Sequence, residues 1–431
     1  MAAQDTIFAL SSGQPPAAIA VMRISGTQAG AALQALGGSL PAPRQASLRQ
    51  LVHPETGATL DHALVLWFPG PDTATGEDLA ELHLHGGRAV VRAVETCLAD
   101  MHGLRAAIAG EFTRRAFLNG RMDLAEAEGL GDLLTAESEL QRQAAMSALS
   151  GRFSQAIESW REDILKLSAR VEAELDFSDE DDVAAGALDA LKVEASTMRS
   201  AIDAVLDQPS AEKLKEGIRV VLAGPPNSGK STLINRLTEK EAAIVSDIAG
   251  TTRDIIEVPV AFQGIPFVFT DTAGLRDAEG DAIEKIGIER ARTVIGEADI
   301  VLWLGAEGEG PQHPMLWEIE AQVDGTPPYA KSGADIRLSA RTGENLDRLI
   351  AKLVSSASVL LPPPDSFAVN QRQRMHLLNV STALTSIAEL EDYLLIGEEL
   401  RLARAALDGL LGSTHTEDML DALFGRFCIG K

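Results

Sequence analysis

The chain has 431 residues, of which 45% are hydrophobic and 23% are charged, and this length exceeds one ordinary core, so two or three domains are expected. It has no apolar run of roughly 18 residues, no basic-then-apolar N-terminal segment and only Cys97 and Cys428, which argues against membrane, secreted and disulfide-framework proteins and for the cytoplasm. The net charge of −25 argues against a stand-alone nucleic-acid binder, which usually presents a basic face.

Residues 1–119 mix short apolar runs with turns. Residues 17–24 (AAIAVMRI) and 62–68 (HALVLWF) have the composition of strands. We therefore expect a small α/β domain at this end of the chain.

Residues 120–215 have a different pattern. Leucine, isoleucine and alanine recur at helical spacing between Leu130 and Val171, which predicts amphipathic helices. The acidic stretch 178–182 interrupts them, and we interpret it as a solvated loop rather than a metal site. This region is predicted to form the first part of a helical domain.

Residues 216–358 alternate apolar strands with helical segments, which predicts a parallel sheet with right-handed crossovers. The predicted strands are residues 218–223, 266–270, 299–304 and 336–338, and a helix is predicted over 232–237.

Helical spacing resumes after the proline run 362–364, so residues 359–431 complete the helical domain. The expected fold is multidomain α/β plus all-α, with a nucleotide-binding domain inserted into a helical one. Exposed loops tolerate such insertions well.

Residues 224–231 (GPPNSGKS) match the phosphate-binding pattern G-x-x-x-x-G-K-S between a predicted strand and a predicted helix. The glycines let backbone N–H groups face phosphate oxygens, and the helix N-terminus adds favourable positive charge. Lys230 is expected to reach the β- and γ-phosphates, and the Ser231 hydroxyl to bind Mg²⁺.

Three further segments follow in the order that a GTPase requires. Residues 250–254 (GTTRD) offer a threonine for Mg²⁺ in a switch segment. Residues 271–274 (DTAG) end a predicted strand, with Asp271 as an outer Mg²⁺ carboxylate and Gly274 sensing the γ-phosphate through its N–H. Residues 339–341 (SAR) fit a base-contacting loop.

The group that positions the attacking water is left open by the residues. The position where many small GTPases carry glutamine holds Leu275. One solution is an arginine finger from a partner. Another is a monovalent cation held by Asn227 and residues 246–251, together with an acid that orients the water. The candidate acids are Asp277, Glu279, Asp281 and Glu284.

Guanine recognition normally uses an N-K-x-D motif, which the sequence lacks. The best substitute that the sequence offers is residues 330–335 (AKSGAD), with Lys331 covering the base and Asp335 replacing the usual aspartate. The alternative is relaxed nucleotide selectivity.

Longer motifs make the comparison specific. These motifs are TGEDLAELHLHGG and GEFTRRAFLNGRMDLAEAE near the N-terminus, then GPPNSGKST, SDIAGTTRD, DTAGLR, IEKIGIERA and the C-terminal FCIGK. On these segments, and over nearly its whole length, the chain resembles the MnmE (TrmE) family of bacterial tRNA-modification GTPases.

That resemblance implies an N-terminal domain that binds formyl-tetrahydrofolate and dimerises, a helical domain and an inserted G domain. It further implies work with MnmG, a flavin- and NADH-using partner, to install a carboxymethylaminomethyl or aminomethyl group on carbon 5 of the wobble uridine (U34) of certain tRNAs. Hydrolysis is then potassium-dependent and coupled to G-domain dimerisation. A basic tRNA-binding face on MnmG would reconcile the acidic charge with this role.

The resemblance also implies roles for single residues. Glu284 would orient the water, Ser231 and Thr252 would bind Mg²⁺, and the folate would contact Arg23, Glu81, Arg121 and Lys431. The potassium ligands would be Asn227, Ser246, Ile248 and Thr251. Together with the motifs, it predicts these GTP-binding residues: Asn227, Ser228, Gly229, Lys230, Ser231, Thr232, Ser246, Asp247, Ile248, Ala249, Gly250, Thr251, Thr252, Asp271, Thr272, Ala273, Gly274, Ser339, Ala340 and Arg341.

Two alternatives remain. His83 and His85 lie two apart on a predicted strand and would face the same side, where a structural role is favoured over a metal pair. At the level of function, the G domain alone also fits a GTP-switched RNA or ribosome assembly factor that makes no covalent change.

Overall fold

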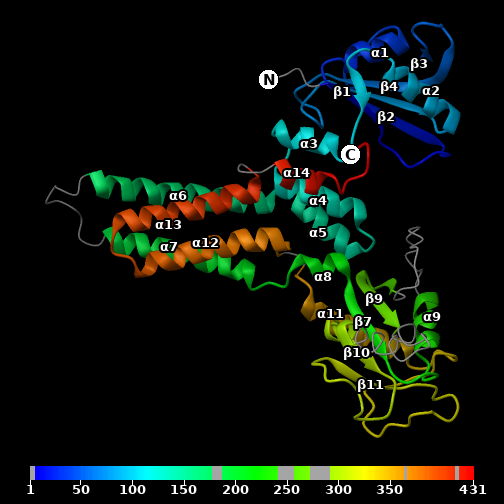
Figure 1. The fold of residues 1–431 in the computed structure, drawn as a ribbon, viewed down its shortest axis with the longest axis vertical. Helices are drawn as coiled ribbons and strands as arrows, with labels where there is room; N and C mark the ends of the chain where they lie inside the picture. The colour runs from blue at the N-terminus through cyan, green and yellow to red at the C-terminus, as the bar shows by residue number, and fades with distance from the viewer. Residues whose placement is uncertain (1–4, 177–186, 241–256, 272–291, 364–365, 413–416) are drawn as a thin grey trace, which may run out of the picture. The chain divides into compact units, whose positions relative to one another are not determined.

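The computed structural model describes residues 5–176, 187–240, 257–271, 292–363, 366–412 and 417–431 (Figure 1). It divides into two compact units. The first contains residues 1–131, 149–161 and 407–431, and the second contains residues 132–148 and 162–406. The acidic stretch 178–182 lies outside the described residues.

The first unit is built on a six-stranded sheet with the order β3-β4-β5-β2-β1-β6. Its strands are β1 (Thr6–Leu10), β2 (Ile19–Ser25), β3 (Ser47–Val52), β4 (Thr59–Phe68), β5 (Leu79–His85) and β6 (Leu104–Ala106). All neighbours are antiparallel except β1 and β6. The two strands predicted from composition correspond to β2 and β4.

One face of this sheet is covered by α1 (Ala29–Gly37) and α2 (Arg88–Ala99), whose apolar residues share a core with the strands. The opposite face keeps apolar side chains in contact with solvent. Ile19 on β2, Leu48 on β3 and Leu64 on β4 are 59%, 67% and 44% exposed, and Leu48 lies directly opposite Leu64. Two adjacent leucines on a sheet face mark a surface suited to a partner.

The C-terminal residues pack on this N-terminal domain. Helix α14 (Glu417–Phe424), which precedes these residues, packs on α3 (Glu111–Leu118). Ile429 forms an antiparallel bridge with Ala109. The Ser11 hydroxyl donates to the Gly430 carbonyl at 2.8 Å. A Cβ at Gly430, where φ is +95°, would lie 2.2 Å from the Leu10 carbonyl oxygen, so only glycine fits there.

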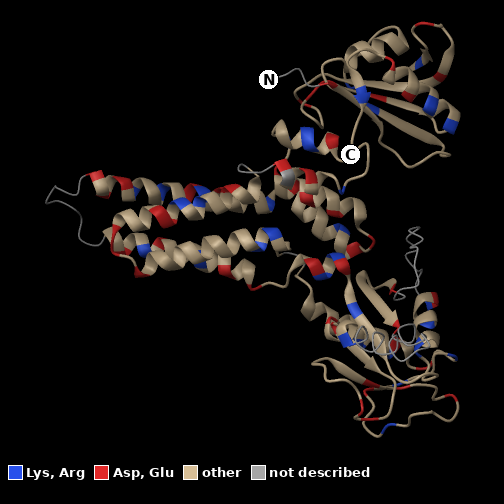
Figure 2. Ribbon diagram, viewed as in Figure 1, with Lys and Arg blue, Asp and Glu red and all other residues tan. Residues whose placement is uncertain are grey.

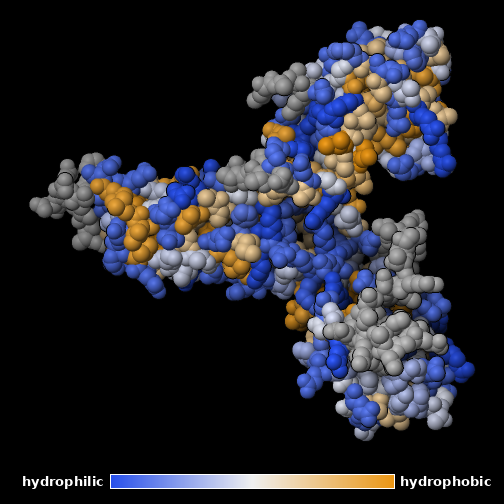
Figure 3. Space-filling view, viewed as in Figure 1, coloured by the Kyte–Doolittle hydropathy of each residue, from blue (hydrophilic) through white to orange (hydrophobic). Residues whose placement is uncertain are grey.

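Helices form the middle of the chain: α4 (Leu124–Thr135), α5 (Glu139–Leu149), α6 (Arg152–Asp176), α7 (Ala187–Leu206), α8 (Ala211–Glu216), α12 (Gln371–Glu389) and α13 (Tyr393–Leu411). Segments from both sides of the G domain pack together, since Ser381 on α12 donates to Asp203 on α7 at 2.6 Å. This agrees with a helical domain built from two stretches of chain. Figure 3 shows apolar surface over α6 and α13, where Leu394 is 67% exposed.

The second sheet has the order β12-β11-β10-β7-β9-β8. Its strands are β7 (Ile218–Ala223), β8 (Glu257–Phe262), β9 (Ile265–Asp271), β10 (Ile300–Trp303), β11 (Leu316–Glu320) and β12 (Ile336–Arg337), with helices α9 (Lys230–Lys240) and α11 (Leu346–Leu360). The predicted parallel pairing holds for β7, β9, β10, β11 and β12. Strand β8 is antiparallel because a two-residue turn joins it to β9.

Candidate functional site

The phosphate loop lies between β7, which ends at Ala223, and α9, which begins at Lys230. Gly224, Asn227 and Gly229 all have positive φ, which curls the loop. The Lys230 side chain is 4% exposed, and its ammonium group donates to the carbonyls of Gly224 and Pro225 at 3.0 and 2.9 Å. The loop therefore holds a buried cation at the N-terminus of a helix, an arrangement suited to phosphate.

The two predicted Mg²⁺-site residues of the described chain lie together. The Ser231 hydroxyl donates to Oδ2 of Asp271 at 2.5 Å, and Asp271 is 7% exposed at the end of β9. Strands β7 and β9 are parallel neighbours, so the loop after one strand meets the carboxyl end of the other. A hydroxyl and a buried carboxylate beside a phosphate loop fit a hard, oxygen-preferring cation such as Mg²⁺.

A pocket opens beside the phosphate loop. Its lining includes Gly229, Thr232, Ala321, Asp324 and Ala340. The segment 321–324 (AQVD) directly follows β11, and the segment 339–341 follows its parallel neighbour β12. The two loops meet where the Ser339 hydroxyl donates to Oδ1 of Asp324 at 2.6 Å.

Asp324 is therefore a carboxylate that lines this pocket from the loop directly after β11. Arg341 donates to its other oxygen, Oδ2, through Nε at 2.7 Å, and the Arg341 side chain is 78% exposed. The hydrogen bond from Ser339 is the largest of the effects that lower the pKa of the Asp324 carboxyl below its ordinary value. The Asp324 carboxyl is therefore an ionised hydrogen-bond acceptor at neutral pH.

Gln322 ties this loop to the phosphate loop. Its side-chain amide donates to the backbone oxygen of Asn227 at 3.2 Å. In the segment 321–324, Ala321 and Gln322 occupy the places of the asparagine and lysine of N-K-x-D, and Asp324 occupies the place of the aspartate.

The candidate at 330–335 is wrong. Lys331 is 3% exposed, and its ammonium group binds Glu318 and the Trp303 carbonyl, both at 2.6 Å, so it cannot cover a base. Asp335 pairs with Lys352 at 2.6 Å and accepts from the Glu318 N–H. Asp324 could not be found from the sequence motif, because Ala321 and Gln322 replace the asparagine and the lysine of N-K-x-D.

Other predicted residues of the nucleotide site lie outside the described residues. They are Glu284, Ser246, Asp247, Ile248, Ala249, Gly250, Thr251, Thr252, Thr272, Ala273 and Gly274. Their roles stay predictions.

The predicted folate residues are partly brought together. Arg23 on β2 lies opposite Glu81 on β5, and its Nη2 is 2.9 Å from Oε1 of Glu81. The Arg23 guanidinium lies 5.9 Å from the centre of the Phe112 ring, and the Phe112 N–H donates to the Lys431 carbonyl at 3.2 Å. Arg23 and Lys431 therefore both contact Phe112, and Glu81 is joined to them through Arg23. Arg121 instead pairs with Asp72 at 3.3 Å.

The strand histidines have separate carboxylate partners. His83 Nε2 lies 3.4 Å from Oε2 of Glu81, and His85 Nδ1 lies 2.7 Å from Oδ1 of Asp61. In the part of the chain that the structure describes, no group of three or more histidine, cysteine or acidic residues is placed to hold a metal, and no helix is long and apolar enough to span a bilayer.

Similarity to known proteins extends over nearly the whole chain. Residues 6–121 match the family description "GTP-binding protein TrmE N-terminus", and residues 124–428 match "MnmE helical domain". A protein named tRNA modification GTPase MnmE from Erythrobacter litoralis is 58% identical over 99% of this chain and 100% of its own length.

The chain belongs to the MnmE family.

Other MnmE relatives are similarly close in length. The tRNA modification GTPase MnmE of Novosphingobium aromaticivorans is 56% identical over 99% of this chain and 100% of its own length. Among solved structures, the G domain of the T. maritima FeoB iron transporter covers 32% of this chain and 98% of its own, with 24% identity and a TM-score of 0.23.

Proposed function

We propose that this MnmE-family GTPase hydrolyses GTP within a complex that adds a carboxymethylaminomethyl or aminomethyl group to carbon 5 of the wobble uridine (U34) of certain tRNAs in the cytoplasm. The observation that carries the proposal is one chain that combines two sites: a phosphate loop with its Ser231–Asp271 pair, and an N-terminal sheet with an Arg23–Glu81 pair. An assembly factor would need only the first.

At the nucleotide site, Lys230 binds the β- and γ-phosphates, and the Asp324 carboxylate accepts hydrogen bonds from N1 and N2 of guanine. Ser231 and Thr252 are the residues that would hold Mg²⁺, with Asp271 behind Ser231. Bound Mg²⁺ neutralises charge that develops on the phosphate oxygens. Support for the Mg²⁺ assignment comes from the short Ser231–Asp271 hydrogen bond.

Potassium would be held by Asn227, Ser246, Ile248 and Thr251, and Glu284 would orient the attacking water. Asn227 supports this assignment through its place at the tip of the phosphate loop, where φ is +59°. A monovalent cation there supplies the positive charge that an arginine finger supplies in other GTPases.

The potassium proposal predicts a clear pattern of nucleotide use. We expect the chain to hydrolyse GTP in potassium and to lose most of that activity in sodium. It should use ATP poorly, because adenine has neither the N1–H nor the 2-amino group from which Asp324 would accept hydrogen bonds. Glu284→Ala should abolish hydrolysis with little change in nucleotide binding. Steady-state phosphate release in both salts measures this, and equal rates in potassium and sodium would remove the cation assignment.

The folate proposal rests on Arg23 and Glu81. An arginine suits the glutamate tail of a folate and a carboxylate suits its guanine-like pterin edge. The Arg23 and Glu81 side chains are 23% and 17% exposed, so both remain reachable by a ligand. Lys431 and Arg121 are proposed as further contacts, and bound formyl-tetrahydrofolate would supply the one-carbon unit.

We expect Glu81→Gln to weaken binding of 5-formyl-tetrahydrofolate by about tenfold or more, since a charge-assisted hydrogen bond contributes about 1.5–3 kcal/mol. Asp61→Asn is the matched control, because Asp61 lies on the neighbouring strand and pairs with His85 instead. Isothermal titration calorimetry measures both variants. Unchanged affinity in Glu81→Gln, with the fold intact by circular dichroism, would move the folate elsewhere.

For partners, we propose a homodimer through the outer face of the N-terminal sheet and a complex with MnmG. The exposed Leu48–Leu64 pair on adjacent strands supports the dimer. In Figure 2, lysine and arginine are interspersed with acidic residues along α6, α7, α12 and α13. Together with the net charge of −25, this supports binding of tRNA mainly by the partner.

A further inference from the structure

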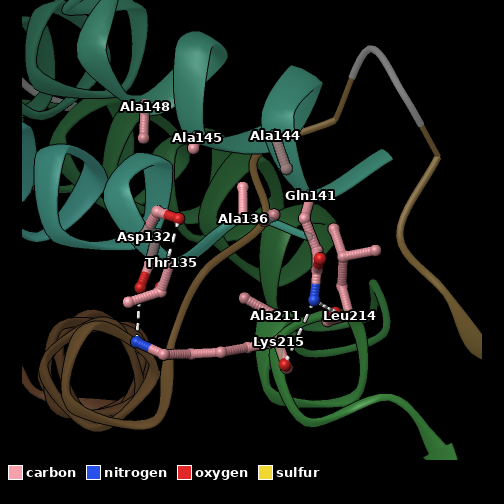
Figure 4. A pocket seen from close by; sticks show the side chains of 11 residues that line it. Asp132, Thr135, Ala136, Gln141, Ala144, Ala145, Ala148, Ala211, Leu214 and Lys215 are labelled. Atoms are coloured by element: carbon pink, nitrogen blue, oxygen red, sulfur yellow. Dashed lines mark hydrogen bonds and ion pairs between the residues drawn. The ribbon is translucent and has the colours of Figure 1, made fainter. Parts of the chain in front are cut away.

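The first turn of α5 is bound to the end of α8, just before the G domain, through the side chain of Gln141. Its Oε1 accepts the backbone N–H groups of Glu137 and Ser138, both at 2.8 Å, which caps α5. Its Nε2 donates to the carbonyls of Leu214 and Lys215 at 3.0 and 3.2 Å. A single amide therefore caps α5 and holds the end of α8 at the same time. Figure 4 shows its contacts with the end of α8.

The end of α8 leads directly to the nucleotide. Helix α8 ends at Glu216, β7 begins at Ile218, and the phosphate loop follows Ala223. Lys215, the residue before the last one of α8, also forms an ion pair with Asp132 on α4. Strand β7 lies inside the sheet between β10 and β9, so it forms a rigid connection between the end of α8 and the loop.

The same turn of α5 also contacts the β8–β9 hairpin of the G domain. The Leu140 N–H donates to the carbonyl of Gly264 at 3.4 Å, and Leu140 and Ala144 pack against the G-domain core. Gly264 lies in the two-residue turn between β8 and β9. At its other end, this hairpin joins the switch segment predicted before β8 and Asp271 at the end of β9, about 20 Å away at strand geometry.

Small side chains leave space at this joint. A cavity of about 60 Å³ lies between α4, α5, α8 and the segment before α12, and on the same measure about 10–15 Å³ holds one water molecule. Alanines form much of its wall, and Figure 4 shows several of them around it. They are Ala136, Ala144, Ala145, Ala148, Ala211 and Ala368. Unlike a close-packed core, such a joint has room for a helix to shift.

We propose that the first turn of α5 couples the nucleotide state to the helical domain, with Gln141 as its positioning residue. The β8–β9 hairpin moves with the switch segments, Leu140 follows the hairpin turn, and the Gln141 amide holds α8 and the phosphate loop in register with α5. The proposal rests on the proposed function, because it assigns the coupling between GTP hydrolysis and tRNA modification to this joint.

Gln141→Glu tests the coupling with a minimal change. Glutamate keeps the acceptor that caps α5, since glutamate is a standard capping-box residue, but it cannot donate to the carbonyls of Leu214 and Lys215. Gln143→Glu is the matched control: Gln143 lies two residues further on the same helix, is exposed, and bonds only Glu139 among the described residues. Ala145→Val is a second variant that narrows the cavity and removes no hydrogen bond.

The readouts are amide hydrogen exchange of residues 138–149, with GDP and with GDP plus aluminium fluoride and potassium, and wobble-uridine modification by the full complex. We expect exchange to differ between the two states in the wild type and in Gln143→Glu, and the difference to be lost in Gln141→Glu and reduced in Ala145→Val. Modification by Gln141→Glu should fall about tenfold while GTP hydrolysis by the free chain stays within about threefold.

Equal exchange of α5 in both nucleotide states of the wild type would overturn the coupling, as would Gln141→Glu modifying tRNA as well as Gln143→Glu. A wild type that hydrolyses GTP and shows the α5 exchange difference but modifies no tRNA would instead overturn the proposed function and leave the joint standing.

Discussion

Asp324→Asn is expected to exchange guanine for xanthine as the preferred base. The Asp324 carboxylate would accept two charge-assisted hydrogen bonds from guanine, each worth about 1.5–3 kcal/mol, so their loss lowers kcat/KM for GTP by on the order of 10²- to 10⁴-fold. An asparagine amide can instead donate to the second carbonyl of xanthine, so kcat/KM for xanthosine triphosphate should rise. Hydrolysis assays with both nucleotides measure the change.

The matched control is Asp335→Asn. Asp335 belongs to the segment that the sequence suggested, but it is bound to Lys352 and to the Glu318 N–H. This variant should keep the preference for GTP. The exposed Arg341 side chain that meets Asp324 should yield to the base readily, because exposed ion pairs contribute little. If Asp335→Asn changes base preference and Asp324→Asn does not, the base pocket has been assigned to the wrong loop.

The second large effect is expected from Ser231→Ala. Removing the hydroxyl takes away a ligand for Mg²⁺ and leaves the Asp271 carboxylate without its 2.5 Å donor. Because a metal ion stabilises the transition state of phosphoryl transfer by several kcal/mol, we expect hydrolysis to fall on the order of 100-fold or more. Raising the Mg²⁺ concentration should restore part of the rate.

Thr238→Ala serves as its control, since the Thr238 hydroxyl lies two turns along α9 and donates only to the Ile234 carbonyl among the described residues. Single-turnover hydrolysis across a Mg²⁺ series separates binding from chemistry. A Ser231→Ala protein with the wild-type rate and the wild-type Mg²⁺ dependence would show that the metal is held elsewhere.

The phosphate loop could be predicted from the sequence because its conformation demands particular residues. Glycine at positive φ and a lysine at the start of a helix leave a local pattern, and the structure has Lys230 and Ser231 where that pattern predicts them. The alternation of strands and helices likewise predicted the parallel part of the sheet. Such features depend on neighbours in the chain.

The proposed base pocket could not be predicted in the same way. Its central contact joins Ser339 to Asp324, and that contact exists because β11 and β12 are neighbours in the sheet. Strand β11 was not predicted. Ala321 and Gln322 also stand where the N-K-x-D motif has asparagine and lysine, so a search for the motif does not find this segment. The contact of Gln141 with the end of α8 could not be predicted from the sequence either. Its partners are the backbone carbonyls of Leu214 and Lys215, which carry no sequence signal.

We propose above that GTP hydrolysis by this chain serves modification of the wobble uridine. The most direct measurement is mass spectrometry of wobble nucleosides from a strain that lacks this chain and is complemented with the wild type or with Ser231→Ala. We expect the C5 substituent to be absent in the deletion strain, restored by the wild type and not restored by Ser231→Ala. Wobble uridines that keep their C5 substituent in the deletion strain would contradict it and favour the assembly factor.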